Sequence, residues 1–312
     1  MSLEKQTAII TGGAGFIGSH IADALLERGY QVVIIDNLST GQRENLPNGA
    51  IFVEADITTM DFATTLEQYR PSVIFHLAAQ LDVRKSVTDP AADAEQNIIA
   101  TIRLLEACKK YPGTKIVFSS SGGAIYGDTT VVPTPDGHPE QPASPYGIAK
   151  LAIEKYLFFY YQVYGIPFVA LRYANVYGPR QNNKGEAGVV AIFTNRFLRN
   201  QAPTIFGDGT QTRDFVFVGD VVAANMAALT SEYVGACNIA TGTETSINQL
   251  TDLLKNLTGS SATIEYAPAK AGEQLRSCLE CSLAHTALLW QPKYDLHTGL
   301  QQTIDWFRSQ SL

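Results

Sequence analysis

The sequence predicts a doubly wound α/β fold, in which a parallel sheet lies between two layers of helices, followed by a smaller α+β lobe. Three observations predict it. Short apolar runs alternate with helical patterns through the first half of the chain, which is the order of βαβ units. A glycine-rich turn follows the first apolar run. After about residue 173 the alternation stops and loop-forming residues become frequent.

The elements follow in order along the chain. Strands are expected at residues 7–11, 32–35, 51–54, 73–77, 115–119 and 168–172, where short apolar runs occur. Helices are expected at residues 20–28, 91–110, 146–164, 189–200, 247–256 and 298–308, where apolar residues recur with a helical period. We therefore divide the chain into a first domain and a second lobe. The domain comprises residues 1–172, with 211–240 returning to it, and the lobe comprises residues 173–210 and 241–312.

The composition of the chain limits the classes of function that it can have. The chain has 312 residues, 45% of them hydrophobic, which is enough for a large core. Its 23 basic and 30 acidic side chains give a net charge of −7, which argues against nucleic acid or an anionic membrane as a partner. Four cysteines are too few for a disulfide scaffold and favour free thiols in the cytoplasm. No membrane span is expected, because the longest apolar run, residues 157–171, is interrupted by polar residues, glycine and proline.

The most informative stretch is the turn TGGAGFIG at residues 11–18, which follows a strand and opens a helix. Its glycines suit left-handed backbone angles and the approach of a pyrophosphate to bare backbone at a helix N-terminus. Asp36 ends the second strand, 18 residues after Gly18, where a carboxylate accepts both hydroxyls of an adenosine ribose. Asn37 follows it in place of a cation, so we favour NAD over NADP as the cofactor.

A second constellation indicates proton chemistry. Tyr146 and Lys150 are spaced to share one face of a helix, so the phenol and the ammonium are neighbours. We expect the cation to lower the pKa of Tyr146 and make it a base. A serine cluster at residues 119–121 ends the fifth strand, and a hydroxyl there can hydrogen-bond the oxygen that the tyrosine deprotonates.

Together these motifs resemble the extended short-chain dehydrogenase/reductase family. Five further stretches resemble its UDP-glucose 4-epimerase branch, within the NAD-dependent epimerase/dehydratase proteins, at residues 36–41, 76–79, 171–180, 213–216 and 272–277. The resemblance spans almost the whole chain. It implies a Rossmann-like domain with tightly bound NAD and a smaller lobe that closes over a nucleotide sugar.

The resemblance also implies a reaction, the inversion of C4 of UDP-glucose or UDP-galactose through a 4-keto sugar. Tyr146 takes the proton of the 4-hydroxyl, the C4 hydride passes to NAD, and the ketone turns over and receives it on its other face. Lys150 lowers the tyrosine pKa and binds the nicotinamide ribose. Ser121 orients the 4-hydroxyl, with Ser120 as the lesser candidate because the alignment slips by one residue.

The resemblance further implies which residues contact each ligand. The cofactor contacts are Gly12, Gly15, Phe16, Ile17, Gly18, Asp36, Asn37, Leu38, Ser39, Thr40, Gly41, Asp56, Ile57, Leu77, Ala78, Ala79, Gln80, Asn97, Ser119, Tyr146, Lys150, Tyr173 and Val176. The substrate contacts are Val83, Ser121, Tyr146, Asn175, Val190, Phe206, Arg213, Glu273, Arg276 and Ser277. Among these, Arg213 and Arg276 supply the bidentate donors that suit a diphosphate.

Single positions separate this branch from its neighbours. Dehydratases place an Asp-Glu pair after the strand-end hydroxyl, and decarboxylases usually carry a carboxylate there. This chain has Gly122 and Gly123, which argues against both. Ser277 stands where some of these epimerases place a bulky side chain, so we hypothesise that UDP-N-acetylglucosamine is used as well as UDP-glucose.

Other classes stay open as alternatives. One is another NAD-dependent nucleotide-sugar epimerase, reductase or decarboxylase on the same scaffold, of which a reductase would consume NADH. The other is a silent NAD-binding regulatory protein, which would not need Tyr146, Lys150 and Ser121. The resemblance implies a homodimer formed by the aromatic helix around residues 158–161 and the helix that ends at Lys109. No metal site is expected, because the pair Cys278 and Cys281 lacks two further ligands. His76 is expected to be a packed strand-end residue.

Overall fold

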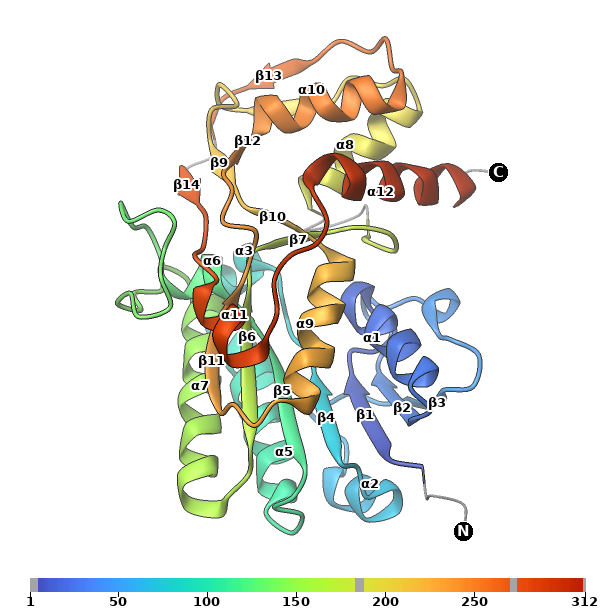
Figure 1. Ribbon diagram of the computed structural model, residues 1–312, viewed down its shortest axis with the longest axis vertical. Coiled ribbons are helices and arrows are strands. Elements are labelled where there is room, and N and C mark those ends of the chain that lie inside the picture. The colour runs from blue at the N-terminus through green and yellow to red at the C-terminus, as the bar shows by residue number, and fades with distance from the viewer. Residues whose placement is uncertain (1–4, 183–187, 270–273, 311–312) are drawn as a thin grey trace.

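Seven parallel strands form the central sheet of the protein, a computed structural model that describes residues 5–182, 188–269 and 274–310 (Figure 1). Their order is β3-β2-β1-β4-β5-β6-β11. The strands are β1 (Thr7–Thr11), β2 (Gln31–Asp36), β3 (Ile51–Glu54), β4 (Val73–His76), β5 (Lys115–Ser121), β6 (Phe168–Tyr173) and β11 (Gly235–Ile239). The first six are the expected strands, and the doubly wound parallel fold is confirmed.

Helices cover both faces of the sheet because successive strand residues point to opposite sides. Ile10 and its face-mates pack under α1 (Phe16–Glu27) and α9 (Val218–Thr230). Ile9 and its face-mates pack under α2 (Phe62–Tyr69), α5 (Ala100–Cys108) and α7 (Pro145–Tyr164). Sequence analysis assigned no helix to 218–230 and no strand to 235–239, although it expected this stretch to return to the first domain. Strand β11 pairs with β6, and α9 packs beside α1.

Capping residues determine where α7, the helix most important for the site, begins and ends. Helix α7 begins after Ser144, whose Oγ accepts the Gly147 N–H at 3.1 Å, with Pro145 in the first turn. It ends at Gly165, which has φ of +71°. The single helix expected at residues 91–110 is instead three segments: α4 (Pro90–Ala94), a π-helical turn at Glu95–Ile99, and α5.

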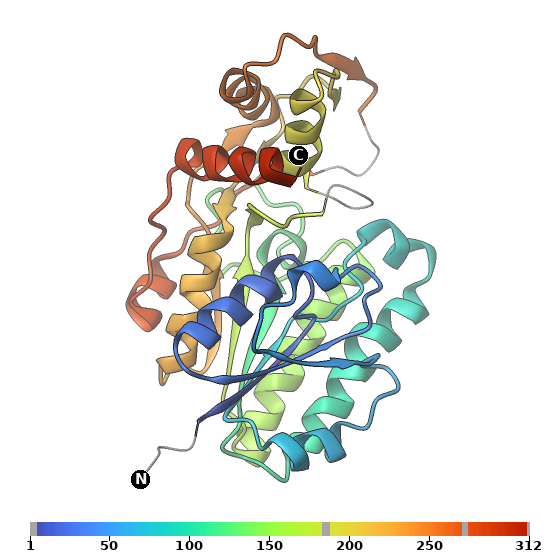
Figure 2. The same ribbon diagram turned by 90° about the vertical axis from the view of Figure 1, so that its right-hand side faces the viewer.

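The second lobe is smaller and built from short elements (Figure 2). Its helices are α8 (Val189–Leu198), α10 (Ile247–Thr258) and α12 (Leu296–Gln310), which pack on one another. Its strands form three small sheets: β7 (Asn175–Tyr177) with β10 (Phe215–Phe217), β8 (Thr204–Phe206) with β13 (Glu265–Ala267), and β9 (Thr212–Arg213) between β12 (Thr245–Ser246) and β14 (Arg276–Ser277). Tyr177, Phe193 and Leu250 belong to its core.

The two lobes meet above the carboxyl ends of the sheet strands (Figure 1). Strand order reverses between β1 and β4, since β2 lies on one side of β1 and β4 on the other. Crevices at such a switch point are where doubly wound folds bind ligands. Three short helices complete the chain: α3 (Val83–Thr88), α6 (Gly122–Ile125) and α11 (Ser282–Leu288). Within the described ranges, none of the helices has the length and apolar character to cross a bilayer.

Candidate active site

The turn after β1 is built from glycines that lie too close to backbone for any side chain. Gly12 has φ of +73°, and a Cβ on it would lie 2.8 Å from the backbone nitrogen of Ala78. A Cβ on Gly18 would lie 2.3 Å from the carbonyl oxygen of Gly12. Because carbon atoms prefer contacts of about 3.5–4.0 Å, larger residues would separate the turn from the end of β4 and the start of α1.

Helix α1 starts immediately after this turn with an uncapped N-terminus. Gly15 is its N-cap, and no side chain accepts a hydrogen bond from the first turn. The N–H groups of Phe16 and Ile17 therefore have no intrahelical acceptor, and with the helix dipole they favour an anion. Apart from its chain neighbours, a Cβ on Gly15 would meet only the Gly12 carbonyl, at 3.1 Å, among the residues placed in the structure. The turn therefore fits the pyrophosphate of a dinucleotide.

Asp36 lies beside the turn at the end of β2 and is 8% exposed. Its Oδ2 accepts the Ala14 N–H at 3.0 Å, and its Oδ1 accepts the Leu38 N–H at 2.8 Å. Each carboxylate oxygen keeps a second lone pair, so the group can still accept two ribose hydroxyls. A Cβ on Gly41 would lie 2.8 Å from Asp36 Oδ1. Asn37, Ser39 and Thr40 are exposed around it.

Asp56 forms the next part of this edge, after β3. Its Oδ2 accepts Asn37 Nδ2 at 2.9 Å, and its Oδ1 accepts the hydroxyl and N–H of Thr58 at 2.6 and 2.8 Å. These hydrogen bonds, led by the Thr58 hydroxyl, lower the pKa of Asp56 and keep it charged. Ile57 is buried in the core beneath α2 and α5, so only its backbone can face a ligand.

The loop after β4 carries four predicted cofactor contacts, Leu77, Ala78, Ala79 and Gln80, all partly exposed. Asn97 holds this loop from behind: its Oδ1 accepts the Gln80 N–H at 2.8 Å, and its Nδ2 donates to the Gln80 carbonyl at 3.0 Å. Asn97 also donates to Asp93 Oδ1 at 3.1 Å and is 2% exposed. Its side chain is thus engaged within the protein, and its effect on a ligand would pass through Gln80.

The remaining cofactor candidates lie where β5, β6 and β7 approach the second lobe. The Tyr173 hydroxyl accepts Asn225 Nδ2 at 2.8 Å and hydrogen-bonds Ser119, and burial raises the pKa of this phenol. Val176 is half-buried between the cores of the two lobes. In the sheet, β4 lies between β5 and β1, the strand that leads into the glycine turn, and β6 lies on the far side of β5.

Tyr146 and Lys150 lie one turn apart on α7 and face the end of β5. The Tyr146 hydroxyl hydrogen-bonds Ser121. Lys150 Nζ donates to the Ser119 carbonyl oxygen at 2.8 Å and lies 5.7 Å from the centre of the Tyr146 ring. The backbone N–H of Tyr146 donates to the buried Ser86 Oγ at 3.2 Å, which anchors the start of α7 on α3. The structure therefore brings the three predicted catalytic residues together.

The predicted lowering of the Tyr146 pKa is wrong for the protein without its cofactor. Burial, opposed by the Ser121 hydrogen bond and reinforced by Asp93, raises the pKa of Tyr146 to about 12. Burial also lowers the pKa of Lys150 to about 8, against the opposing effects of Asp93 and Glu154. Loss of hydration disfavours both the phenolate and the ammonium, and helical spacing carries no information about it.

The structure separates the two serines that the sequence left as alternatives. Ser120 Oγ donates to Glu154 Oε1 at 2.6 Å and is 2% exposed. Ser121, the next residue, hydrogen-bonds Tyr146. Side chains alternate along a strand, so one hydroxyl points into the protein beneath α7 and the other points to the tyrosine. Ser121 is therefore the serine placed to meet a substrate oxygen.

The two glycines after the serines leave no acid or base at that position. A Cβ on Gly122 would lie 2.3 Å from Leu279 Cδ1, so a carboxylate side chain there would have to displace the leucine side chain. A Cβ on Gly123 would lie 3.4 Å from Ser277 Oγ. Ser277, one of the predicted substrate contacts, therefore faces the start of α6 beside Ser121.

The predicted anion-binding residues lie on neighbouring strands of the second lobe. Strands β9 and β14 run parallel, with Ser277 opposite Arg213 and Arg276 next to it. Arg213 Nη1 donates to the Thr212 carbonyl at 2.7 Å. Arg276 is 53% exposed and pairs with Glu244 at 2.5 Å. Arg213 is thus on the central strand of the three-stranded sheet, and Arg276 is on its edge strand, one residue away in register.

Asp214 holds together the backbone around these strands. Sequence analysis did not single it out as a site residue. It is 1% exposed. Its carboxylate accepts the N–H groups of Thr241 and Gly242, both at 2.9 Å, and the Thr241 hydroxyl at 2.7 Å. Its own backbone bonds Asn175 N–H and the Ser277 carbonyl at 2.9 and 2.8 Å. The exposed Asn175 is thereby held near both arginine-bearing strands.

The other predicted substrate contacts differ in how far they are exposed. Val83 on α3 and Phe206 at the end of β8 are 40% and 37% exposed. Val190 is 1% exposed and belongs to the core of the second lobe. Packing therefore leaves only the backbone of Val190 to reach a ligand, and its substrate contact stays a prediction. Glu273 lies outside the described residues.

Residues without an assigned function behave as buried structure. His76 bonds the hydroxyls of Thr11 and Thr101 at 2.7 and 2.9 Å, and burial lowers its pKa to about 3. It is therefore neutral and packed, as predicted. Cys278 is buried against Asp214, with Sγ 3.5 Å from Oδ2. In the part of the chain that the structure describes, no three His, Cys, Asp or Glu residues cluster as metal ligands do.

Sequence reasoning missed Asp93, Glu154 and Asp214. Glu154 had a signal, because it continues the spacing of Tyr146 and Lys150 by four residues on α7. Asp93 and Asp214 had none, because Asp93 acts on residues more than 50 positions away and Asp214 binds a loop 27 positions away.

Comparisons with known proteins agree with this geometry. The profile of the NAD dependent epimerase/dehydratase family matches residues 8–240. The UDP-glucose 4-epimerase of Mycolicibacterium smegmatis is 43% identical over 97% of this chain and 99% of its own. The crystal structure of the Thermotoga maritima UDP-glucose 4-epimerase with UDP-glucose has 48% identity and a TM-score of 0.96, covering 98% of this chain and 100% of that one.

A second solved structure contains the cofactor. The Thermus thermophilus UDP-glucose 4-epimerase in complex with NAD has 41% identity and a TM-score of 0.92, and it covers 97% of this chain and 99% of that one. The glycine turn, the uncapped start of α1 and Asp36 are the parts of this chain that fit such a dinucleotide. The chain belongs to the NAD-dependent epimerase/dehydratase family.

Proposed function

We propose that the protein is a UDP-glucose 4-epimerase, an NAD-dependent isomerase that interconverts UDP-glucose and UDP-galactose. The observation that carries the proposal is the hydrogen bond between Tyr146 and Ser121, with the Lys150 ammonium beside it, at the edge of the sheet where the glycine turn fits a dinucleotide. The activities of the relatives support it. Galactose metabolism is the pathway that such an activity serves.

Proton transfer is the task of this chain's own residues. Ser121 orients the sugar 4-hydroxyl toward Tyr146. The Tyr146 oxygen takes the hydroxyl proton as C4 becomes a carbonyl, and it returns the proton to O4 after the ketone has presented its other face. When bound, NAD supplies a positively charged ring and takes up and returns the C4 hydride. Lys150 stabilises the phenolate by its charge and holds the end of β5 through Ser119.

The second lobe holds the nucleotide diphosphate. Arg213 and Arg276 offer planar donors to its phosphates from adjacent strands, and Asn175 offers an amide beside them. Residues 173–210 and 241–312 form this substrate lobe, and residues 1–172 with 211–240 form the NAD-binding domain. Because Arg276 already pairs with Glu244, a diphosphate would compete with that carboxylate for the guanidinium.

The enzyme is a cytoplasmic homodimer on this proposal. All four cysteines are free thiols, which suits a reducing compartment. Large apolar side chains are exposed along α7 and the adjacent π-helical turn, and exposed patches of this kind mark interfaces. Apart from Ile148 near the start of α7, they are Ile99, Tyr156, Phe158, Phe159, Val163 and Tyr164. We call these six residues the apolar face.

Ser277 favours a second substrate. It faces Gly123 beside the catalytic serine, and neither residue has a bulky side chain. A larger substituent on the sugar therefore finds room there, and UDP-N-acetylglucosamine is a substrate as well as UDP-glucose. Ser277→Tyr should abolish turnover of the acetylated sugar and preserve turnover of UDP-glucose. Equal loss of both activities would refute the assignment.

One experiment tests the proposed function. The purified protein is incubated with UDP-galactose, UDP-N-acetylgalactosamine or UDP-glucuronate without added cofactor, and the product sugars are separated by chromatography. Formation of UDP-glucose without net NADH consumption supports a 4-epimerase that retains its NAD. In a parallel incubation with added NADH, its stoichiometric consumption would identify a reductase instead. No turnover of any nucleotide sugar would favour the non-enzymatic alternative.

A further inference from the structure

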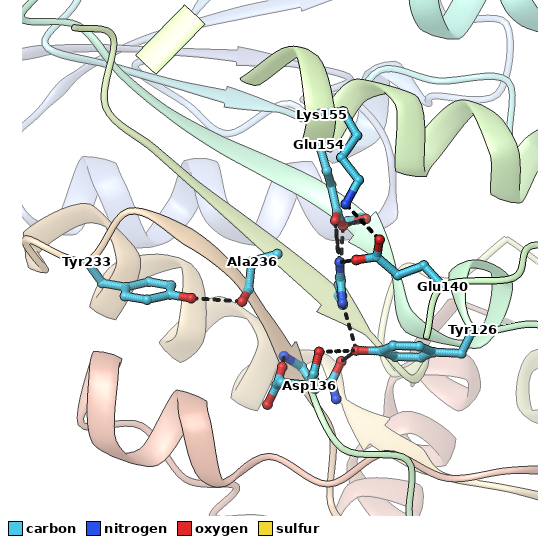
Figure 3. Close-up of polar contacts among 10 residues, drawn as sticks. Tyr126, Asp136, Glu140, Glu154, Lys155, Tyr233 and Ala236 are labelled. Carbon is cyan, nitrogen blue, oxygen red and sulfur yellow. Dashed lines mark hydrogen bonds and ion pairs between the residues drawn. The ribbon is translucent and has the colours of Figure 1, made fainter. Parts of the chain in front are cut away.

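A buried ion pair lies directly behind the candidate active site, between α7 and β6. Glu154 and Arg172 are each 4% exposed. Arg172 Nη2 donates to Glu154 Oε2 at 2.6 Å, and Nε donates to Oε1 and Oε2 at 3.0 and 3.2 Å (Figure 3). Such a bidentate arrangement fixes the orientation of both side chains. The pair therefore sets how α7 sits on the sheet.

Glu154 also holds the strand that carries the catalytic serine. Ser120 Oγ donates to Glu154 Oε1 at 2.6 Å. Residues 146, 150 and 154 follow one another by single turns on α7, and each contacts one of three consecutive serines. Tyr146 hydrogen-bonds Ser121, Lys150 bonds the Ser119 carbonyl, and Glu154 bonds Ser120.

The network extends from Arg172 to the loop between α6 and α7. Arg172 Nη1 donates to the Tyr126 hydroxyl at 2.8 Å, and Tyr126 in turn donates to Asn238 Oδ1 at 3.0 Å. On its other side Arg172 pairs with Glu140, which also accepts Lys155 Nζ at 2.7 Å (Figure 3). Glu140 therefore binds the same guanidinium as Glu154 but contacts neither the serines nor Lys150.

Glu154 is also part of the electrostatic surroundings of Lys150. The groups that face this ammonium are Asp93 from α4, Glu154 from α7, the phenol of Tyr146, and the neutral imidazole of His76 from β4. The two carboxylates favour the charged ammonium, against its burial. Removal of either carboxylate would therefore leave Lys150 easier to deprotonate.

We propose that Glu154 is a positioning residue for the reaction: it clamps Ser120, and with it the end of β5, against α7, so that Ser121 meets Tyr146 and Lys150 stays charged. The proposal rests on the proposed epimerase function. Glu154 touches neither Tyr146 nor Ser121, so its effect passes through Ser120 and Lys150.

The test compares three variants in the full-length enzyme. Glu154→Gln removes the buried charge at nearly constant shape. Glu140→Gln is the matched control, since it removes one carboxylate from the same arginine. Ser120→Ala breaks the clamp and leaves every charge in place. We expect Glu154→Gln and Ser120→Ala to lower kcat at least fivefold with KM within twofold of the wild type, and Glu140→Gln to stay within twofold in both.

A pH profile gives a readout that a merely structural role would not move. If charged Lys150 is required, kcat falls as pH rises through its pKa, and loss of the Glu154 charge moves that fall to lower pH. We expect a shift of half a pH unit or more in Glu154→Gln, and none in Ser120→Ala or Glu140→Gln. If Glu154→Gln does not fold, Ser120→Ala still tests the positioning role, because it breaks the clamp without removing a buried charge.

The outcomes separate this inference from the proposed function. A wild-type enzyme that turns over no UDP-sugar refutes the function itself. An active wild type with Glu154→Gln and Ser120→Ala as active as Glu140→Gln overturns the positioning role. Equal losses in Glu154→Gln and Glu140→Gln, with an unchanged pH profile in both, would also overturn it, because the arginine pair would then act only through stability.

Discussion

The Lys150 ammonium donates a 2.8 Å hydrogen bond to the carbonyl oxygen of Ser119, two residues before the serine that meets Tyr146. One side chain thus links the helix that carries the proposed base to the strand that carries its hydroxyl partner. Because Lys150 is 3% exposed, little water competes for this bond, and the separation of α7 and β5 is fixed at the point of chemistry.

Tyr146→Phe should nearly abolish activity. The change removes the oxygen that exchanges the proton of the 4-hydroxyl, and loss of a general base lowers rates by about 10²–10⁴-fold. The rate is measured as conversion of UDP-galactose to UDP-glucose. Tyr161→Phe, which removes the same atom elsewhere on α7, is the control and should keep full activity. Retention of more than a tenth of the rate by Tyr146→Phe would exclude it as the base.

Arg276→Ala should weaken substrate binding far more than turnover. Loss of a charged hydrogen bond to a phosphate costs about 1.5–3 kcal/mol, so KM should rise roughly 10–100-fold with kcat within threefold. Steady-state kinetics with UDP-glucose measure both constants. Arg308→Ala removes a cation of similar exposure on α12 and should change neither. An unchanged KM in Arg276→Ala would place the diphosphate elsewhere.

Asp136 should make stability depend on pH in an unusual direction. Burial raises its pKa to about 6 from 3.8, partly opposed by the Asn238 N–H, and Oδ2 has no partner among the described residues. The folded protein therefore binds the proton more tightly than the unfolded chain. This contribution is fully present below pH 3.8 and is lost as pH rises through 6.

Asp136→Asn removes that titration. The free energy of unfolding of the variant, relative to the wild type, should rise by roughly 1 kcal/mol between pH 4 and pH 8. The full pKa shift of Asp136 corresponds to about 3 kcal/mol. The expected change is smaller because the side chain is partly exposed, and solvent screens its charge. Urea unfolding at both pH values measures the difference. A difference that does not change with pH would contradict the assignment.

Phe158→Glu should convert the protein to monomers. Phe158 is 56% exposed within the apolar face of α7, and a carboxylate buried in a dimer interface without a partner is strongly unfavourable. Sedimentation velocity of the purified protein measures the state. Leu289→Glu is the control, since Leu289 is 90% exposed after α11 and outside the apolar face. If both variants remain dimers, the interface lies on another surface.

The sequence by itself determined the features that depend on neighbouring residues. Apolar periodicity located the six strands from β1 to β6, and the spacing of Gly12, Gly15 and Gly18 located the turn. Tyr146 and Lys150 share a helix face because backbone geometry alone sets that relationship. The family resemblance then assigned these residues their chemistry, and the comparisons confirm the family.

Only the tertiary structure decided what depends on burial and on contacts between distant segments. It showed that burial raises the pKa of Tyr146, that Ser120 points to Glu154 while Ser121 points to Tyr146, and that Val190 lies in a core. Glu154 is 34 residues from Ser120 and 18 from Arg172. Hydration and long-range proximity arise when the sheet and helices pack together, so no local pattern encodes them.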